Sequence, residues 1–257
     1  MHKAKKNLSQ NFLQDEVVLQ DLINYVKPAS EDSFLEIGPG KGVLTERIIP
    51  QVKNLDAVEL DKDLMLGLKI LEQNVNNFNV HHENILNFNM DLLSQPSELR
   101  VLGNLPYNIS SAVVLWSFKN IERFTDMHYM FQKEFGQRLF SQPGKKSYGR
   151  LSVLTQYMTE VTNLFTIMPE SFKPRPSVES IFVKLTPIPG RNINSKIAIK
   201  LQEVTRIVFS KRRKMLSKSL KDILGKEDFI DLDINPSDRP EDLRVEDFVK
   251  ISELLIK

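Results

Sequence analysis

One stretch decides the fold class, because a short apolar segment runs directly into a turn with three glycines: Ser33-Phe34-Leu35-Glu36-Ile37-Gly38-Pro39-Gly40-Lys41-Gly42. Its first five residues predict a strand, and residues 43–49 predict a helix that Pro50 ends. Glycines between a strand and a helix let the backbone approach a ligand closely, since no Cβ intervenes. The pattern is G-x-G-x-G rather than the G-x-G-x-x-G of dinucleotide folds, and Pro39 lacks an amide that a pyrophosphate would need. The turn therefore favours a ligand without phosphate.

The same alternation of strand and helix continues along the chain. Helices are expected at 15–26, 62–73 and 110–118, and strands at 54–60, 99–102 and 127–131. This order predicts an α/β fold with a mostly parallel sheet that helices cover on both faces. Glu59 closes the second strand, 21 positions after Gly38, where an acid accepts hydrogen bonds from ribose hydroxyls in nucleotide-binding sheets. Together these features suggest S-adenosylmethionine; the alternative is a purely structural turn followed by a strand-end acid.

A change of pattern near residue 187 predicts a domain boundary. The stretch Thr186-Pro187-Ile188-Pro189-Gly190-Arg191 resists regular structure, and after it apolar residues recur at helical spacing at Ile197, Leu201, Val204 and Val208. We therefore expect an α/β domain over residues 1–186 and a small all-α domain over residues 187–257.

Composition excludes several classes of protein. The 257 residues are 41% hydrophobic and 26% charged, which is typical of globular chains. Cysteine is absent, which removes disulfides, thiolate zinc sites and a catalytic thiol. His81 and His82 lack the spaced acids of a metal site, so no metal is expected. No apolar run is long enough to span a membrane, and the basic segment 1–7 lacks the apolar region of a secretory signal. These features predict a cytoplasmic protein.

Positive charge is concentrated in one segment. The net charge is only +2, but residues 206–221 contain seven basic side chains and no acidic one, so the rest of the chain carries −5. Such a segment is typical of a surface that binds a polyanion, although a solvated helix face would have the same composition.

A set of short motifs, in this order, resembles the ribosomal small-subunit adenine dimethyltransferase family, the kasugamycin-sensitivity enzymes. The resemblance covers about residues 7–224. The motifs are Ser9-Gln10-Asn11-Phe12-Leu13, the glycine turn through Thr45, Gly103-Asn104-Leu105-Pro106-Tyr107-Asn108-Ile109-Ser110, Phe131-Gln132-Lys133-Glu134 before Arg138-Leu139, Tyr148-Gly149-Arg150-Leu151-Ser152, Phe172-Lys173-Pro174-Arg175-Pro176-Ser177-Val178-Glu179-Ser180 and Phe209-Ser210-Lys211-Arg212-Arg213-Lys214-Met215-Leu216.

The resemblance implies a Rossmann-like class I methyltransferase that uses S-adenosylmethionine. Its expected reaction is dimethylation of N6 on two adjacent adenosines in the 3′-terminal hairpin of 16S rRNA, during ribosome biogenesis. The expected partner is the small ribosomal subunit with its rRNA; no membrane is involved, and the chain is taken to be a monomer. The residues expected to contact the cofactor are Asn11, Leu13, Gly38, Gly40, Glu59, Asn84 and Asn104. The family usually has Asp at position 84, so the adenine contact there could come from Asn84 or from Glu83.

The chemistry explains why an Asn-Leu-Pro-Tyr segment suits this reaction. The lone pair of adenine N6 is delocalised into the ring, and acceptors at both N6 hydrogens favour a pyramidal, nucleophilic nitrogen. The Asn104 oxygen and the Leu105 carbonyl would be these acceptors, with Pro106 fixing the turn. Tyr107 would stack on the extruded adenine, and Phe172 would be its second aromatic face, unless Phe172 is an ordinary core residue. Outside this context the tetrapeptide would predict only a strand-exit turn.

Phosphate contacts are expected from the basic segment, at Lys211, Arg212, Arg213, Lys214 and Lys218. Two other functions stay open at this point. One is the macrolide-resistance type of methyltransferase, which modifies one adenosine of large-subunit rRNA. The other is a non-catalytic ribosome-assembly factor, which the intact Asn-Leu-Pro-Tyr segment argues against.

Overall fold

The computed structural model describes residues 10–256, and the chain divides into two compact units. The first unit contains residues up to Gly136 and Thr162–Pro187, and the second contains Gln137–Val161 and the residues from Ile188 onward. The expected boundary near residue 187 coincides with the last of the three breaks, between Pro187 and Ile188. Residues 137–161, which the pattern assigned to the first domain, group with the C-terminal helices instead. The basic segment 1–7 lies outside the described residues.

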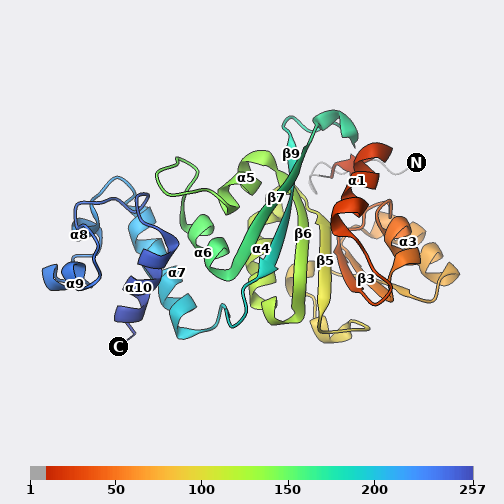
Figure 1. Ribbon diagram of the computed structural model, residues 1–257. Coiled ribbons are helices and arrows are strands. Elements are labelled where there is room, and N and C mark those ends of the chain that lie inside the picture. The colour runs from red at the N-terminus through yellow and green to blue at the C-terminus, as the bar shows by residue number, and fades with distance from the viewer. Residues whose placement is uncertain (1–9, 257) are drawn as a thin grey trace. The chain divides into compact units, whose positions relative to one another are not determined.

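A seven-stranded sheet forms the centre of the first unit (Figure 1). Its order is β4-β3-β2-β5-β6-β9-β7, and the pairings from β4 to β6 are parallel, whereas β9 runs antiparallel to β6. The strands are β2 (Ser33–Ile37), β3 (Asn54–Glu59), β4 (Phe78–His82), β5 (Leu99–Asn104), β6 (Phe124–Gln132), β7 (Thr159–Ile167) and β9 (Ser180–Pro187). The expected mostly parallel sheet is confirmed. Strands β4, β7 and β9 were not anticipated.

Helices cover both faces of this sheet. On one face, α1 (Glu16–Val26), α2 (Thr45–Ile48) and α3 (Lys62–Asn74) contribute to an apolar core with side chains from the strands, among them Phe34 and Leu55. On the other face lies α4 (Ser110–Lys119), whose Ser117 hydroxyl is 2.7 Å from that of the buried Tyr129 on β6. The two faces follow from the alternation of side chains along each strand.

Local signals set the helix boundaries. Asp15 caps α1, because its carboxylate accepts hydrogen bonds from the amides of Val17 and Val18 at 3.0 and 3.3 Å. The helix expected at 43–49 is shorter: α2 ends at Ile48 and continues as a 3₁₀ turn, η2 (Ile49–Gln51), that contains Pro50.

A second, two-stranded sheet fixes the start of the described chain. In it, β1 (Phe12–Leu13) pairs antiparallel with β8 (Phe172–Lys173), with Leu13 opposite Phe172. The Ser171 hydroxyl also donates to the Asp15 carboxylate at 2.9 Å. Residues 12–15 are therefore held by a segment about 160 positions away.

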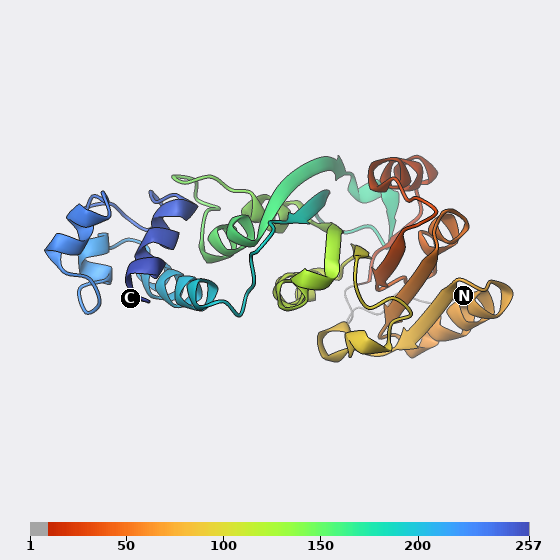
Figure 2. The same ribbon diagram turned by 60° about the horizontal axis from the view of Figure 1, so that its bottom comes forward.

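The second unit is helical. Helices α6 (Arg150–Met158), α7 (Lys196–Ser210) and α10 (Val245–Leu254) pack against one another, as Figure 2 shows for α7 and α10. The remaining helices are α8 (Leu216–Ser219) and α9 (Lys226–Asp231), while α5 (Lys133–Leu139) runs across the break between the units. Of the helices in residues 10–256, none has the length and apolar character needed to span a bilayer.

Candidate functional site

A pocket opens at the carboxyl ends of β2, β3 and β5, the edge where ligands bind in parallel α/β sheets. Five separate segments line it: 10–13, the glycine turn with residues 36–44, 58–60, 83–85 and 104–109. The structure therefore brings together the predicted cofactor residues Asn11, Leu13, Gly38, Gly40, Glu59, Asn84 and Asn104, along with Leu105, Pro106 and Tyr107.

The glycine turn adopts a backbone that only glycine accepts easily. Gly38, Gly40 and Gly42 have φ angles of 68°, 62° and 79°, in the left-handed region. A Cβ on Gly40 would also lie 3.3 Å from the Phe12 ring, tighter than ordinary contact. The turn thus places bare backbone along the pocket, as its sequence predicts.

The Glu59 carboxylate accepts two hydrogen bonds from the backbone. One oxygen accepts from the Gly40 amide at 3.0 Å and the other from the Asp61 amide at 2.8 Å. The side chain is buried, and burial raises the pKa of this carboxyl, against the opposing effect of those hydrogen bonds. Each oxygen retains acceptor capacity beyond its one backbone bond. Glu59 is therefore a pre-oriented acceptor at the pocket wall.

Glu36, the acid at the start of the glycine motif, lies deeper. It is only 3% exposed and accepts a 2.6 Å hydrogen bond from the Thr45 hydroxyl. Burial raises the pKa of Glu36 to about 7, with the Thr45 bond acting in the other direction. Within residues 10–256 neither Glu36 nor Glu59 forms an ion pair. The pocket floor consequently holds two acids without a cation.

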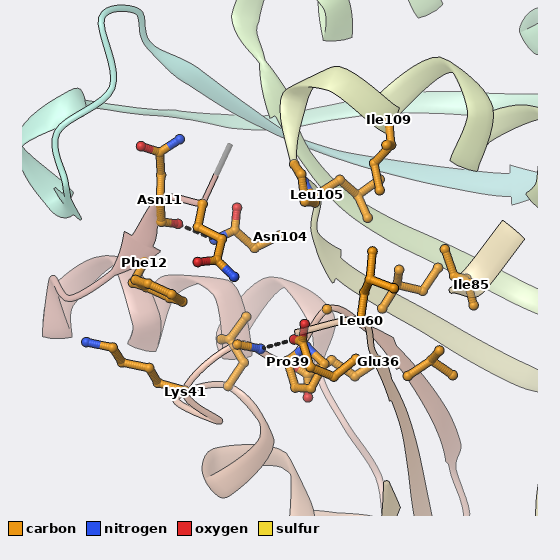
Figure 3. A pocket seen from close by; sticks show the side chains of 18 of the residues that line it. Asn11, Phe12, Glu36, Pro39, Lys41, Leu60, Ile85, Asn104, Leu105 and Ile109 are labelled. Carbon is orange, nitrogen blue, oxygen red and sulfur yellow. Dashed lines mark hydrogen bonds between the residues drawn. The ribbon is translucent and has the colours of Figure 1, made fainter. Parts of the chain in front are cut away.

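The Asn104-Leu105-Pro106-Tyr107 segment leaves β5 beside the pocket. The Asn104 amide nitrogen donates to the Asn11 carbonyl at 3.1 Å, and in Figure 3 this side chain reaches toward Asn11 from across the pocket. This bond holds the Asn104 side chain through its nitrogen, and the side-chain oxygen takes no part in the bond. The Tyr107 hydroxyl is 2.8 Å from the Ser180 hydroxyl, and burial raises the pKa of Tyr107, so its ring is a neutral phenol.

Asn84 and Glu83 are both at the pocket, and each takes part in a local turn. The Asn84 oxygen caps the 3₁₀ turn η3 (Ile85–Asn87) by accepting from the Leu86 amide at 3.1 Å. A Glu83 carboxylate oxygen accepts a hydrogen bond from the backbone amide of Asn84 at 2.8 Å. Asn84 is half-buried, whereas Glu83 is exposed.

Apolar side chains form a wall of which the sequence identified only Leu105. Figure 3 shows Leu60, Ile85, Leu105 and Ile109 on one side of the pocket, with Asn11, Phe12 and Lys41 on the other. The Lys41 ammonium lies 4.8 Å from the centre of the Phe12 ring. Leu60 is half exposed although it is apolar, which marks it in the structure as a wall residue rather than a core residue.

Phe172 does not line the pocket, although it lies opposite the pocket residue Leu13 in the pairing of β1 with β8. It is 4% exposed and belongs to the apolar core that α1, α2 and α3 share with the sheet. In this structure its surroundings are those of a core residue, the alternative that its sequence context left open.

The five predicted phosphate-binding residues are not equivalent. Lys211, Arg213, Lys214 and Lys218 are exposed. Arg212 instead donates to the carbonyls of Lys146 at 2.8 Å and Lys145 at 3.2 Å and to the Glu241 carboxylate. The Arg212 guanidinium therefore forms its bonds within the second unit. In the described part of the chain no cluster of His, Asp and Glu is arranged to hold a metal ion.

Comparison with known proteins extends these observations to a family. A model of the ribosomal RNA adenine dimethylase family matches residues 1–257. The chain belongs to this family. One relative in the family, ribosomal RNA small subunit methyltransferase A of Marinomonas sp. (strain MWYL1), is 42% identical over 260 residues, which is 100% of this chain and 97% of the relative. The protein of the same name from Saccharophagus degradans is 40% identical and covers 99% and 95% of the two chains.

Solved structures agree with the dimethylase assignment. A dimethyladenosine transferase from Plasmodium falciparum superposes with a TM-score of 0.80 at 25% identity, covering 93% of this chain and 95% of its own. The 23S rRNA methyltransferase ErmE has a TM-score of 0.76 at 20% identity, over 96% and 100% of the chains, and shares the fold. The expected methyltransferase fold is thereby confirmed for this family member.

Proposed function

We propose that this chain transfers methyl groups from S-adenosylmethionine to N6 of two adjacent adenosines in the 3′-terminal hairpin of small-subunit rRNA, giving N6,N6-dimethyladenosines. The observation that carries the proposal is the position of Asn104: it ends β5, lines the pocket beside Glu59 and the glycine turn, and begins the Asn-Leu-Pro-Tyr segment. The full-length similarity to small-subunit methyltransferases supports the choice of RNA. A ribosomal substrate supports the expected cytoplasmic location.

The hydrogen-bond acceptors and apolar side chains that line the pocket support binding of this cofactor. Glu59 would accept hydrogen bonds from the ribose hydroxyls, and the bare backbone at Gly38 and Gly40 admits the ligand closely. Leu60 and Ile85 would contact the flat adenine, with Asn84 accepting from its amine. Glu36 and Glu59, which no cation among residues 10–256 pairs with, suit a ligand with positive charge. Pro39 has no backbone N–H to offer a phosphate, which suits a ligand without one. When bound, S-adenosylmethionine supplies an electrophilic methyl group.

The residues after Asn104 would act on the target base. The Asn104 oxygen and the Leu105 carbonyl accept the two N6 hydrogens, which concentrates the lone pair on N6 at the position where it attacks. Asn104 is held for this by the bond from its nitrogen to the Asn11 carbonyl. Tyr107, anchored through its hydroxyl to Ser180, offers a ring for stacking. Phe172 stays a candidate for the second face only if base binding uncovers it.

Single-turnover methylation of small subunits that lack the modification tests the proposal. The parent should methylate them and should leave large subunits unmodified. Asn104→Ala should abolish transfer while subunit binding stays near normal, since phosphate contacts supply most of that affinity. Near-parental rates for Asn104→Ala would reject the mechanism. Methylation of large subunits would favour the macrolide-resistance type, and binding without transfer by the parent would favour an assembly factor.

Phe172→Ala tests the second stacking face in the same assay. A lost stacking contact would cost about 1–3 kcal/mol in base binding, with cofactor binding intact. A near-parental rate would return Phe172 to the core.

A further inference from the structure

The half-buried Arg212 sits among exposed basic residues, yet its guanidinium bonds to the protein rather than facing solvent. It lies in the turn 211–214 after α7 and bonds to Lys145, Lys146 and Glu241, which are 67, 66 and 29 positions away in the chain. Two of the three acceptors are backbone carbonyls, so the contacts depend on the position of the loop and not on its side chains.

The loop that Arg212 contacts, residues 141–148, is anchored mainly at its two ends. Gln156 donates to the Ser141 carbonyl at 2.8 Å, and Tyr148 is fully buried with its ring against Phe209. Near the tip, the Gly144 amide donates to the Glu241 carbonyl at 2.7 Å. Arg212 completes this second attachment. The tip at Lys145 and Lys146 is therefore fastened to the 211–214 turn and to Glu241 by backbone-directed bonds.

Charge accumulates where the two segments meet. Lys145 and Lys146 on the loop, and Lys211, Arg213 and Lys214 on the turn, are all exposed. Of the acids near this region, Glu241 is half-buried and paired with Arg212, Asp242 beside it is exposed, and Glu246 and Asp247 lie on the side of the buried Tyr148. Both segments belong to the second unit, so the juxtaposition lies within one compact body.

We propose that Lys145 and Lys146 form one phosphate-binding surface with Lys211, Arg213 and Lys214, and that Arg212 is a positioning residue that holds the 141–148 loop in this surface. The partner is the sugar–phosphate backbone of the rRNA, so the inference rests on the proposed function. A planar guanidinium reaches two carbonyls and a carboxylate together, whereas the ammonium of lysine is a single point charge. The positioning role is therefore specific to arginine.

A charge-conserving substitution separates positioning from direct contact. Arg212→Lys retains the positive charge but loses the three-way contact. Arg206→Lys, at an exposed arginine of α7 outside the proposed surface, is the matched control. Small-subunit binding is measured between about 50 and 200 mM salt, where each lost phosphate contact reduces the slope of log affinity against log salt by about 0.7–0.9. Arg212→Lys should weaken binding and flatten the slope as Lys145→Ala/Lys146→Ala does. Combining the two changes should add little. Arg206→Lys should match the parent.

Glu241→Gln tests the same idea with the opposite electrostatic expectation. Removing a negative charge beside a polyanion site should tighten RNA binding if only charge matters, whereas loss of the Arg212 anchor should weaken it. Tryptic cleavage after Lys145 and Lys146 gives a readout that needs no RNA: it should accelerate in Arg212→Lys and Glu241→Gln but not in Arg206→Lys.

Circular dichroism and thermal unfolding check that the helical second unit of each variant is folded, and cofactor binding checks the first unit. Equal behaviour of Arg212→Lys and Arg206→Lys, or tighter binding by Glu241→Gln, overturns the inference. Faster tryptic cleavage without weaker subunit binding also overturns it. These outcomes appear only in the variants, whereas a parent that neither binds nor methylates small subunits overturns the proposed function itself.

Discussion

Buried acids at the two ends of the central sheet have opposite charged surroundings. At the amino end, the Asp126 carboxylate on β6 accepts two bonds from Arg100 at 3.0 and 3.1 Å, and Lys184 lies 3.2 Å away. Arg100 also bonds Asp32 at 2.7 Å and the carbonyls that end α1. Burial alone would raise the pKa of Asp126, but the neighbouring His128 ring and the Arg100 guanidinium outweigh it and hold that pKa well below its usual range.

At the carboxyl end, no cation among residues 10–256 pairs with Glu36 or Glu59, and burial raises the pKa of both. A compensated acid stabilises the folded chain, whereas an uncompensated one costs stability until a ligand supplies the missing charge or donors. The contrast indicates that the amino end holds the unit together, while the carboxyl end is arranged for a ligand that approaches with positive charge and hydrogen-bond donors.

The largest effect is expected from removing the central cation of the amino end. Arg100→Met leaves the Asp126 carboxylate buried without its main partner, so the free energy of unfolding should fall by about 3 kcal/mol. Urea denaturation measures this. Arg123→Met, which breaks an exposed pair with Asp91, is the control and should change stability by less than about 1 kcal/mol. Similar losses in both variants would contradict the view that the amino end is the stabilising one.

Glu36→Gln should change how stability depends on pH. In the folded chain the pKa of Glu36 is raised to about 7 from an ordinary 4.5, so its stabilising effect is complete below pH 4.5 and is lost as the pH rises through 7. The loss amounts to about 3 kcal/mol. Glutamine cannot ionise, so the variant should be more stable than the parent at pH 8 and similar at pH 4.5. Thermal unfolding at both values tests this, with the exposed Glu46→Gln as control. Parallel curves for parent and variant would count against it.

Glu59→Ala should weaken the cofactor rather than the fold. If Glu59 accepts from the ribose hydroxyls, the lost charge-assisted bonds are worth about 1.5–3 kcal/mol, a roughly tenfold to hundredfold rise in the dissociation constant for S-adenosylmethionine. Titration calorimetry measures it. An unchanged constant would remove the ribose assignment.

The smallest effect is expected at position 84. Asn84→Asp keeps the oxygen that caps η3 and adds a charge toward the adenine amine, so it should bind S-adenosylmethionine at least as tightly as the parent. Glu83→Ala should leave the affinity unchanged. Weaker binding by the first variant, or by the second, would assign the adenine contact to Glu83.

The parallel half of the sheet was predictable because its signals are local. Residues 33–37, 54–60 and 99–102 are apolar runs bounded by turns and helices, and each was assigned within two residues of its observed end. Strand β4, Phe-Asn-Val-His-His, has too few apolar residues to stand out, and the antiparallel β9 was not distinguished from its surroundings. The pairing of β9 with β6 is a long-range contact that no local sequence pattern predicts.

The polar part of the site was also predictable, since glycines, a strand-end acid and the Asn-Leu-Pro-Tyr segment are unusual in composition. The apolar wall at Leu60, Ile85 and Ile109 was not, because such residues resemble core residues until their exposure is known. The role of Arg212 was also not predictable from the sequence. Its basic neighbours in the chain suggest a phosphate contact, whereas the groups that it bonds to lie 29 to 67 positions away.

The pairing of β1 with β8 has a consequence for the order in which the chain becomes competent. The N-terminal part of a chain leaves the ribosome first, so Phe12 and Leu13 emerge long before Phe172 and Lys173, the strand that pairs with them. A nascent chain of 160 residues already contains the glycine turn, Glu59 and Asn104, whereas β1 still lacks its partner strand. We therefore expect the part of the pocket wall formed by Phe12 and Leu13 to be completed only after synthesis has passed residue 173.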